Sequence, residues 1–206
     1  MRVFVTGTDT NVGKTLVSAW LCKHFELDYF KPVQAGLLPM TDSEWVRRYA
    51  DCHTHPEAYR LREPASPHYA ARLEGRELVL NEINLPAAQR LVVEGAGGVM
   101  VPLARGCLMI DLIAHLGLPV LLVASTRLGT LNHTLLTLQA LRLREIAVPG
   151  VILNGPQCDM TAQAISDFGD VPVLQHVPVL SGGVSASALM QVAPTAALAR
   201  ALGATV

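Results

Sequence analysis

The sequence predicts a three-layer α/β fold with a mostly parallel central sheet and helices on both faces. Half of the 206 residues are hydrophobic but only 5% are aromatic, and the aliphatic residues gather in short continuous runs. Strands buried on both faces of a parallel sheet have this pattern, whereas half-exposed strands alternate. Helical segments separate the runs, as in βαβ units. No repeat or linker divides the chain, so we expect one domain.

Six apolar runs are expected as strands because each is short and rich in aliphatic residues. In chain order they span residues 2–6, 28–33, 90–93, 118–124, 149–153 and 171–174, of which 28–33 is the weakest. Four segments between them are expected as helices, at residues 14–25, 109–116, 130–145 and 160–168. Residues 41–85 are the most polar and least regular part of the chain, so we expect short helices and a substrate-facing loop there.

Charge and composition exclude several classes of protein. There are 16 Lys and Arg against 17 Asp and Glu, giving a net charge of −1, so neither nucleic acid nor an anionic membrane is an expected partner. No apolar stretch reaches the roughly 18–20 residues of a membrane span. The first run meets Gly7 and Asp9 too early for a signal peptide. Four scattered cysteines without a CxxC pair indicate reduced thiols and a cytoplasmic protein.

Residues 7–15, GTDTNVGKT, follow the first expected strand and open the first expected helix. This is the setting of a P-loop, in which backbone N–H groups and the helix N-terminus bind phosphate oxygens. Lys14 is then expected on the β- and γ-phosphates of ATP, and Thr15 on Mg²⁺. Every residue of the loop is predicted to bind the nucleotide: Gly7, Thr8, Asp9, Thr10, Asn11, Val12, Gly13, Lys14 and Thr15. The fold class narrows to the P-loop NTPase fold, with residues 1–206 as a single nucleotide-binding domain.

One irregularity leaves an alternative open, because five residues and not the usual four separate Gly7 from Gly13. The alternative is a glycine-containing strand-to-helix turn that binds nothing. A second acid favours the P-loop, since the apolar residues 91–93 run into Glu94. A carboxylate at the end of a parallel strand lies where α/β sheets bind ligands. Glu94 is therefore a candidate metal ligand, and the alternative is a solvent-facing acid at the strand end.

Four segments, taken in order, resemble the dethiobiotin synthetase family: GTDTNVGKT at 7–15, KPVQAG at 31–36, VEGAGG at 93–98 and GTLNH at 129–133. The resemblance covers nearly the whole chain. It implies an ATP-dependent ligase of biotin biosynthesis that converts 7,8-diaminopelargonic acid, CO₂ and ATP to dethiobiotin, ADP and phosphate. It also implies a homodimer that uses Mg²⁺, with ATP as co-substrate and a small diamine as substrate.

The family's chemistry implies catalytic roles for Lys14, Lys31 and Thr10. One amine takes up CO₂ to form a carbamate, whose oxygen attacks the γ-phosphate and gives a carbamic-phosphoric anhydride. The second amine then closes the cyclic urea and releases phosphate. Because carbamate and phosphate are both anionic, cations are needed between them. The resemblance implies that Lys14 and Lys31 supply this charge, with Thr10 contacting substrate and phosphate. The alternative for Lys31 is a surface lysine beside a proline.

The same resemblance implies a metal site formed by Thr15, Asp42 and Glu94. Asp42 stands in the sequence TDSEW, where Glu44 is a competing carboxylate. The alternative for Asp42 is a plain helix N-cap, because aspartate is among the preferred capping residues.

The resemblance further implies substrate contacts at Lys31, Gln34, Ser66, Gly97 and Asn132. Base contacts are implied at Asn154, Pro178 and Val179, since an amide offers both a donor and an acceptor to adenine. In the family an asparagine matching Asn132 reaches across the dimer to the substrate carboxylate. The leucine-rich helix that begins here predicts a partner subunit or deep burial. The alternatives are an ordinary turn for Ser66 and helix capping by Asn132 or Thr130.

Other nucleotide-dependent functions compete with this interpretation. One is another P-loop enzyme, such as a small-molecule kinase or an amidase-type ATPase domain. A kinase usually has an arginine-rich lid, whereas arginines here are clustered at 47–48, 60–62 and 142–144. Another is a partitioning-type ATPase switch, whose additional loop lysine is missing from residues 8–11. A third is a nucleotide-binding module without catalysis, which the retained lysines disfavour. DCHTH at 51–55 is expected to be a solvated loop and not a metal site, since no second ligand pair accompanies it.

Overall fold

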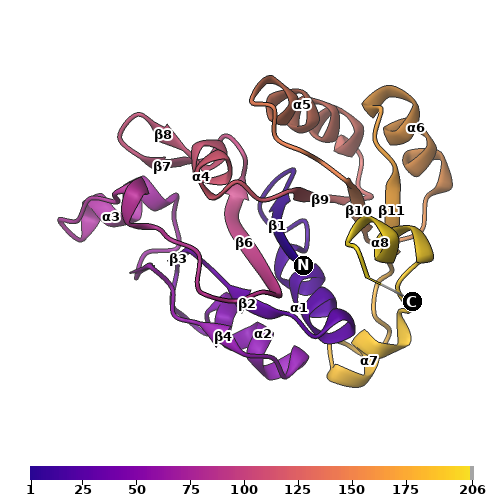
Figure 1. Ribbon diagram of the computed structural model, residues 1–206, viewed down its shortest axis with the longest axis horizontal. Coiled ribbons are helices and arrows are strands. Elements are labelled where there is room, and N and C mark those ends of the chain that lie inside the picture. Colours follow the sequence, from indigo (N-terminus) through magenta and orange to yellow (C-terminus); the bar gives the residue numbers. More distant parts are fainter. Residues whose placement is uncertain (205–206) are drawn as a thin grey trace.

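A seven-stranded parallel sheet forms the centre of the protein in the computed structural model, which describes residues 1–204 (Figure 1). The strands lie in the order β11-β10-β9-β1-β6-β2-β4, and every neighbouring pair is parallel. Their bounds are β1 (Arg2–Gly7), β2 (Asp28–Phe30), β4 (Thr54–His55), β6 (Leu91–Gly98), β9 (Val120–Ser125), β10 (Gly150–Asn154) and β11 (Val173–Val177). The predicted parallel sheet is confirmed.

Two small sheets and a set of helices complete the fold. The first small sheet pairs β3 (Val33–Ala35) with β5 (Tyr59–Leu61), and the second pairs β7 (Pro102–Ala104) with β8 (Cys107–Leu108). The helices are α1 (Lys14–Phe25), α2 (Asp42–Ala50), α3 (Pro67–Leu73), the 3-10 turn η1 (Leu80–Glu82), α4 (Met109–Leu116), α5 (Thr130–Leu143), α6 (Asp159–Gly169), α7 (Ala186–Gln191) and α8 (Ala196–Ala201). In the part of the chain that the structure describes, no helix is long and apolar enough to cross a membrane.

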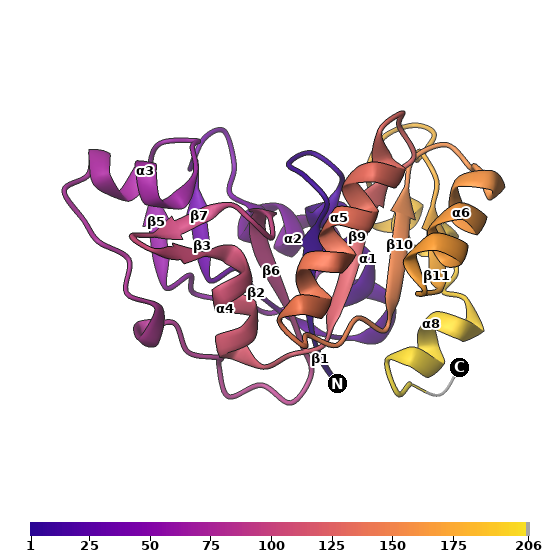
Figure 2. The same ribbon diagram turned by 90° about the horizontal axis from the view of Figure 1, so that it is seen from above.

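Helices cover both faces of the sheet because its strands alternate buried apolar side chains between two cores. Val3 and Val5 of β1 belong to a core shared with α1, α2, α7 and α8. Phe4, between them, belongs to the opposite core with α3 and α4, and α5 packs with α6 over β9 and β10. Figure 2 shows α5 on one side of the sheet and α1 on the other. This is the predicted three-layer arrangement.

Three expected strands differ from the observed ones. The run at 28–33 is divided into β2 and β3, which belong to different sheets, because Pro32 between them has no N–H for a ladder. The strand expected at 171–174 lies at Val173–Val177, since it begins only after Pro172 and continues through Gln175 and His176. Gln175 is buried and hydrogen-bonded, so its polarity is a poor guide to its location.

The third difference concerns β6, which does not end at Glu94 but continues through the glycines to Gly98. The prediction of Glu94 as the last residue of its strand is therefore wrong, because β6 pairs with β1 again beyond Glu94: after an irregularity in the ladder, Gly98 lies opposite Gly7. The irregular segment 41–85 contains the expected short helices and also two short strands. Residues 54 and 55, expected in a loop, form one of them, β4.

Candidate active site

The loop between β1 and α1 has the geometry of a phosphate-binding loop. β1 ends at Gly7 and α1 begins at Lys14, so the helix N-terminus opens directly onto the loop. Gly13 precedes α1 with a φ of 98° and gives it no side-chain cap, which leaves the first N–H groups of the helix available to an anion. A side chain at position 13 would collide with the amide of Asn154. Lys14 Nζ donates to the carbonyl oxygen of Asp9 at 2.9 Å.

Glu94 is the centre of a buried hydrogen-bonded network. Its side chain is fully buried, and its Oε1 accepts from Thr15 Oγ1 and from Lys31 Nζ, each at 2.9 Å. Its Oε2 accepts from the hydroxyl of Tyr29 at 3.0 Å. The alternative of a solvent-facing acid is wrong, and so is the alternative of a surface lysine for Lys31, which is 3% exposed.

Asp42 joins this network through Lys31, whose Nζ lies 2.6 Å from Asp42 Oδ2. Asp42 is the first residue of α2, and the N-cap is Thr41, which forms a capping box with Glu44. The capping alternative for Asp42 is therefore wrong, and Glu44 is used by the cap. The backbone N–H of Asp42 donates to Gln34 Oε1 at 3.2 Å, so Gln34 fixes the start of α2 near the network.

The two lysines have opposite electrostatic environments. The pKa of Lys14 is lowered to about 8, mainly by burial. The nearby Glu94 carboxylate opposes this decrease, and the positive charge of Lys31 contributes to it. Burial would also lower the pKa of Lys31, but Glu94 and Asp42 outweigh it and raise that pKa. The Lys31 ammonium in turn keeps the pKa of Asp42 below its ordinary value despite burial. Lys31 is thus held charged by its partners, whereas Lys14 titrates closer to neutrality.

A cavity of about 650 Å³ is lined by the predicted catalytic and metal residues and by every predicted substrate residue except Asn132. Its lining includes Thr10, Lys14, Thr15, Lys31, Gln34, Asp42, Ser66, Glu94 and Gly97. Ser66 is the N-cap residue of α3, and its side chain makes no capping hydrogen bond, so its contact with substrate stays a prediction. Gly97 has a φ of 70°, and a Cβ there would lie 2.6 Å from Val101 Cγ2. The cavity therefore needs glycine at this point of its wall.

A second cavity of about 330 Å³ brings together the three residues predicted for adenine, Asn154, Pro178 and Val179. Asn154 Nδ2 donates to the carbonyl oxygen of Val12 at 3.0 Å, which ties this cavity to the phosphate loop. Asn11 and the adjacent helix residue Leu16 line both cavities. The two cavities therefore adjoin along the loop, as a nucleotide with its phosphates and base would require.

Asn132 lies apart from the other predicted residues. It is exposed in the first turn of α5 and lines neither of these two cavities. The N-cap of α5 is Gly129, with a φ of 93° and no side-chain cap bond. The alternative that Asn132 or Thr130 caps the helix is therefore wrong.

Thr15, Asp42 and Glu94 are suited to a hard divalent cation. Their donors are a hydroxyl and two carboxylates, which are the oxygen ligands that Mg²⁺ accepts. Thr15 donates a hydrogen bond to Glu94. The ammonium group of Lys31 forms ion pairs with both Asp42 and Glu94, which keeps the two carboxylates close together. The chemistry of this donor set fits Mg²⁺.

The sequence prediction missed Tyr29. This residue is fully buried, and burial together with the adjacent Glu94 raises the pKa of its hydroxyl well above the ordinary value, so it stays protonated and donates. A signal was available, because a tyrosine in a strand buried on both faces must direct its hydroxyl to a partner. The sequence does not indicate that Glu94, 65 residues away, is that partner.

The fold and the loop define the chain as a P-loop ATPase, and residues 1–186 match the family model described as AAA domain. A solved ParA family ATPase from Chlorobium tepidum TLS aligns with a TM-score of 0.56 at 14% identity, covering 98% of this chain and 96% of that one. A likeness at this identity extends to the fold alone. This similarity therefore does not support the partitioning function that was considered from the sequence.

Curated relatives narrow this class further, and the chain belongs to the ATP-dependent dethiobiotin synthetase family. It is 50% identical over 181 residues to the enzyme of that name from Lawsonia intracellularis, covering 88% of this chain and 89% of that one. It is 49% identical over 187 residues to the one from Paramagnetospirillum magneticum, covering 90% and 91%. A third, from Brucella ovis, is 48% identical over 183 residues, covering 87% and 86%. The family predicted from the sequence is confirmed.

Proposed function

We propose that this chain, an ATP-dependent ligase of the dethiobiotin synthetase family, closes a cyclic urea in biotin biosynthesis. The reaction converts 7,8-diaminopelargonic acid, CO₂ and ATP to dethiobiotin, ADP and phosphate. One substrate amine forms a carbamate with CO₂ and releases a proton. A carbamate oxygen then attacks the γ-phosphorus, and ADP leaves. The second amine attacks the carbonyl carbon of the carbamic-phosphoric anhydride, and phosphate leaves as the ring closes.

The observation that carries this proposal is that Lys14 and Lys31 open into one cavity. The attack joins two anions, a carbamate and a triphosphate, so fixed positive charge lowers its barrier. Lys14, at the helix N-terminus, binds the β- and γ-phosphates. Lys31, held charged by Glu94 and Asp42, faces the carbamate, and Thr10 contacts both partners from the loop.

Thr15, Asp42 and Glu94 are proposed to hold Mg²⁺. The cation supplies charge that neutralises the phosphates during transfer. Glu94 depends on Tyr29 for its orientation, since the tyrosine hydroxyl donates a hydrogen bond to Oε2 of the carboxylate. Asp42 depends on Gln34, whose amide accepts from the Asp42 N–H and donates to the Gly36 carbonyl oxygen. These side chains keep the ligand oxygens in place before the nucleotide arrives.

The diamine is proposed to bind between the α3 loop and the glycines of β6. Ser66 offers its hydroxyl there, Gly97 lets the substrate approach the backbone, and Gln34 forms part of the wall. At the other end, Pro178 and Val179 flank the adenine ring. Asn154, whose Nδ2 donates to Val12, offers Oδ1 to the amino group of the base.

We further propose a homodimer in which Asn132 reaches the diamine carboxylate of the partner. Asn132 lines neither of the two cavities described. Large apolar side chains are exposed along α5 and in the turn before it: Leu128 is fully exposed, and Leu131, Leu136 and Leu143 are at least 38% exposed. A second copy of the chain would cover this face. The four free cysteines support a reducing cytoplasm as its location. A single seven-stranded sheet that takes strands from β1 to β11 supports residues 1–206 as one domain.

The test is ATP turnover with Mg²⁺, bicarbonate and the diamine, following ADP release and the cyclic urea. Turnover should require the diamine. ATP hydrolysis that proceeds equally without it would overturn the proposal. Light scattering should give a mass of two chains, and Leu136→Asp should give one. A wild-type mass of one chain would exclude the dimer.

A further inference from the structure

A second group of ligand-forming side chains lies at the edge of the central sheet, on β2 and β4. The two strands pair in parallel, with Tyr29 opposite Thr54 and Phe30 opposite His55. This register places Asp28 opposite His53, and the Tyr29 N–H donates to the His53 carbonyl oxygen at 2.9 Å. Because alternate residues of a strand share a face, Asp28, His53 and His55 project to the same side of this edge.

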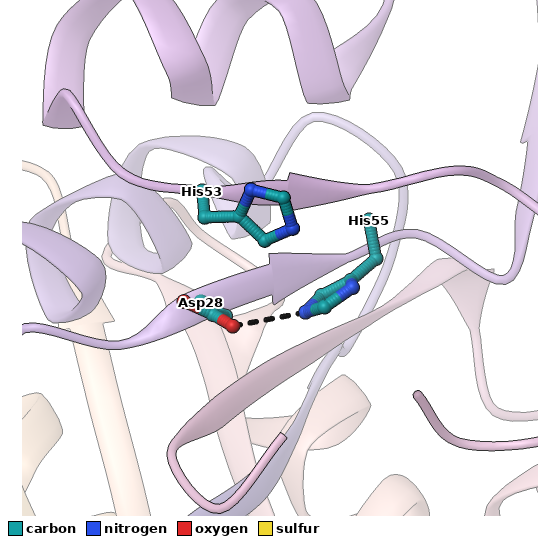
Figure 3. A group of neighbouring side chains, drawn as sticks. All are labelled: Asp28, His53 and His55. Carbon is teal, nitrogen blue, oxygen red and sulfur yellow. Dashed lines mark hydrogen bonds and ion pairs between the residues drawn. The ribbon is translucent and has the colours of Figure 1, made fainter. Parts of the chain in front are cut away.

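The three side chains lie close together (Figure 3). His55 Nε2 lies 2.9 Å from Asp28 Oδ2, and the His53 and His55 rings are 4.5 Å apart between centroids at an interplanar angle of 88°. One ligand atom from each residue lies within 4.8 Å of the others. The side chain of Asp28 is 36% exposed and that of His55 is 18% exposed, so water reaches the group.

We propose that Asp28, His53 and His55 form a binding site for a borderline divalent transition-metal ion, with Zn²⁺ as the metal of choice. Two imidazoles and one carboxylate are a donor set for such ions, and water completes a four-coordinate site. Zinc ligands lie about 2.0–2.2 Å from the ion, so small side-chain rotations bring the three atoms to the required separation. An ion pair between Asp28 and His55 alone does not account for His53, whose ring stands against His55.

The site is distinct from the magnesium site of the proposed function. Tyr29, between Asp28 and Phe30, points to the opposite face of β2 and reaches Glu94. The metal would instead connect β4, an edge strand of two residues, to the neighbouring strand β2. A bond across this short edge pairing would stabilise the folded chain by mass action, since the unfolded chain lacks the site.

The test uses untagged full-length chain with excess Mg²⁺, which occupies the oxygen ligands of the catalytic cavity. Zn²⁺ is titrated in competition with a chromogenic chelator. Wild type should bind one equivalent. His53→Ala, which removes an exposed ring and leaves the Asp28–His55 pair intact, should weaken binding by at least about tenfold. Asp28→Asn should do the same, and His115→Ala, which removes an exposed imidazole on α4, should not.

Two further readouts decide the outcome. Zn²⁺ should raise the unfolding temperature of wild type and of His115→Ala, but not of His53→Ala. Co²⁺ in place of Zn²⁺ should give visible bands of a nitrogen- and oxygen-ligated ion. Equal zinc affinity in wild type and His53→Ala would overturn the proposal. So would a thiolate-to-cobalt charge-transfer band, which would place the metal on the free cysteines.

Discussion

The two adjoining cavities differ in the charge of the residues that line them. The larger one is lined by Lys31, Asp42 and Glu94, which come from separate segments. Lys31 pairs with Glu94, whose side chain is fully buried, and with Asp42, whose side chain is 33% exposed. The smaller one is formed by the segments that follow β9, β10 and β11, and Arg127 is the one charged residue in its lining. The first thus offers fixed charge to phosphates, and the second offers a mostly uncharged wall and the amide of Asn154 to a base.

This difference predicts how each cavity responds to change. Removing one partner of a buried ion pair leaves the other charge unpaired, at a cost of about 3–5 kcal/mol. A substitution at an uncharged position in the wall of the smaller cavity removes only local contacts. Substitutions in the larger cavity should therefore abolish turnover, and those in the smaller one should change nucleotide affinity and choice. The following experiments range from the largest expected effect to the smallest.

Lys14→Ala should reduce turnover by at least about 100-fold, because it removes the charge nearest the transferred phosphate. ADP release with saturating diamine measures the effect. Lys23→Ala is a matched control, since Lys23 lies near the other end of α1 and should keep wild-type turnover. Full activity of Lys14→Ala would show that the loop does not bind ATP as proposed.

ATP affinity should fall as the pH rises through about 8, the value to which burial lowers the pKa of Lys14. Below this pH the ammonium is charged and binds phosphate; above it the neutral amine does not. Titration without diamine from about pH 7 to about pH 10 should show a decrease of up to about tenfold per pH unit. Lys14→Ala should show no such decrease. A flat profile in wild type would remove Lys14 from phosphate binding.

Tyr29→Phe should lower turnover by about tenfold and raise the Mg²⁺ concentration needed for half-maximal rate. The lost hydroxyl donates to a charged acceptor, a bond that typically contributes about 1.5–3 kcal/mol. ATP binding without Mg²⁺ should be unchanged, which separates positioning of Glu94 from general damage. Tyr49→Phe on α2 serves as the control. An unchanged Mg²⁺ requirement would mean that Glu94 keeps its orientation without Tyr29.

Asn154→Ala should have the smallest effect, a few-fold loss of ATP affinity with a reduced preference for ATP over GTP. Calorimetric titration of both nucleotides measures it. Asn132→Ala is the counterpart, because it should raise the diamine KM and leave ATP affinity unchanged. If Asn154→Ala bound both nucleotides like wild type, the smaller cavity would not be the base site.

The sequence predictions were most accurate where they depended on local patterns. Helix α1 has the predicted bounds because the glycine-lysine-threonine signal and the following apolar residues are contiguous. The assignment of Lys31 to the active site required the family resemblance, and the sequence does not predict its contact with Glu94, since no local pattern connects residues 63 positions apart. The glycine extension of β6 could not be predicted, because glycine has low strand propensity and only its pairing with β1 keeps it extended.

The Asp28, His53 and His55 group was unpredictable for the same reason. It depends on the pairing of a two-residue edge strand with β2, and Thr54–His55 has no hydrophobic pattern that would indicate a strand. The sequence shows the two histidines but not the third ligand, 25 positions before His53. Tertiary pairing, not composition, brings the three together.

The lysine content of the chain has a consequence for covalent chemistry. There are three lysines. Lys14 and Lys31 are both largely buried and line the same cavity, but the pKa of Lys31 is raised, whereas the lowered pKa of Lys14 leaves part of it as free amine near neutral pH. Besides the amino terminus, an acylating reagent should therefore label Lys14 ahead of the others. Bound ATP should shield it, so mass spectrometry of a single modified peptide would report nucleotide occupancy without any turnover.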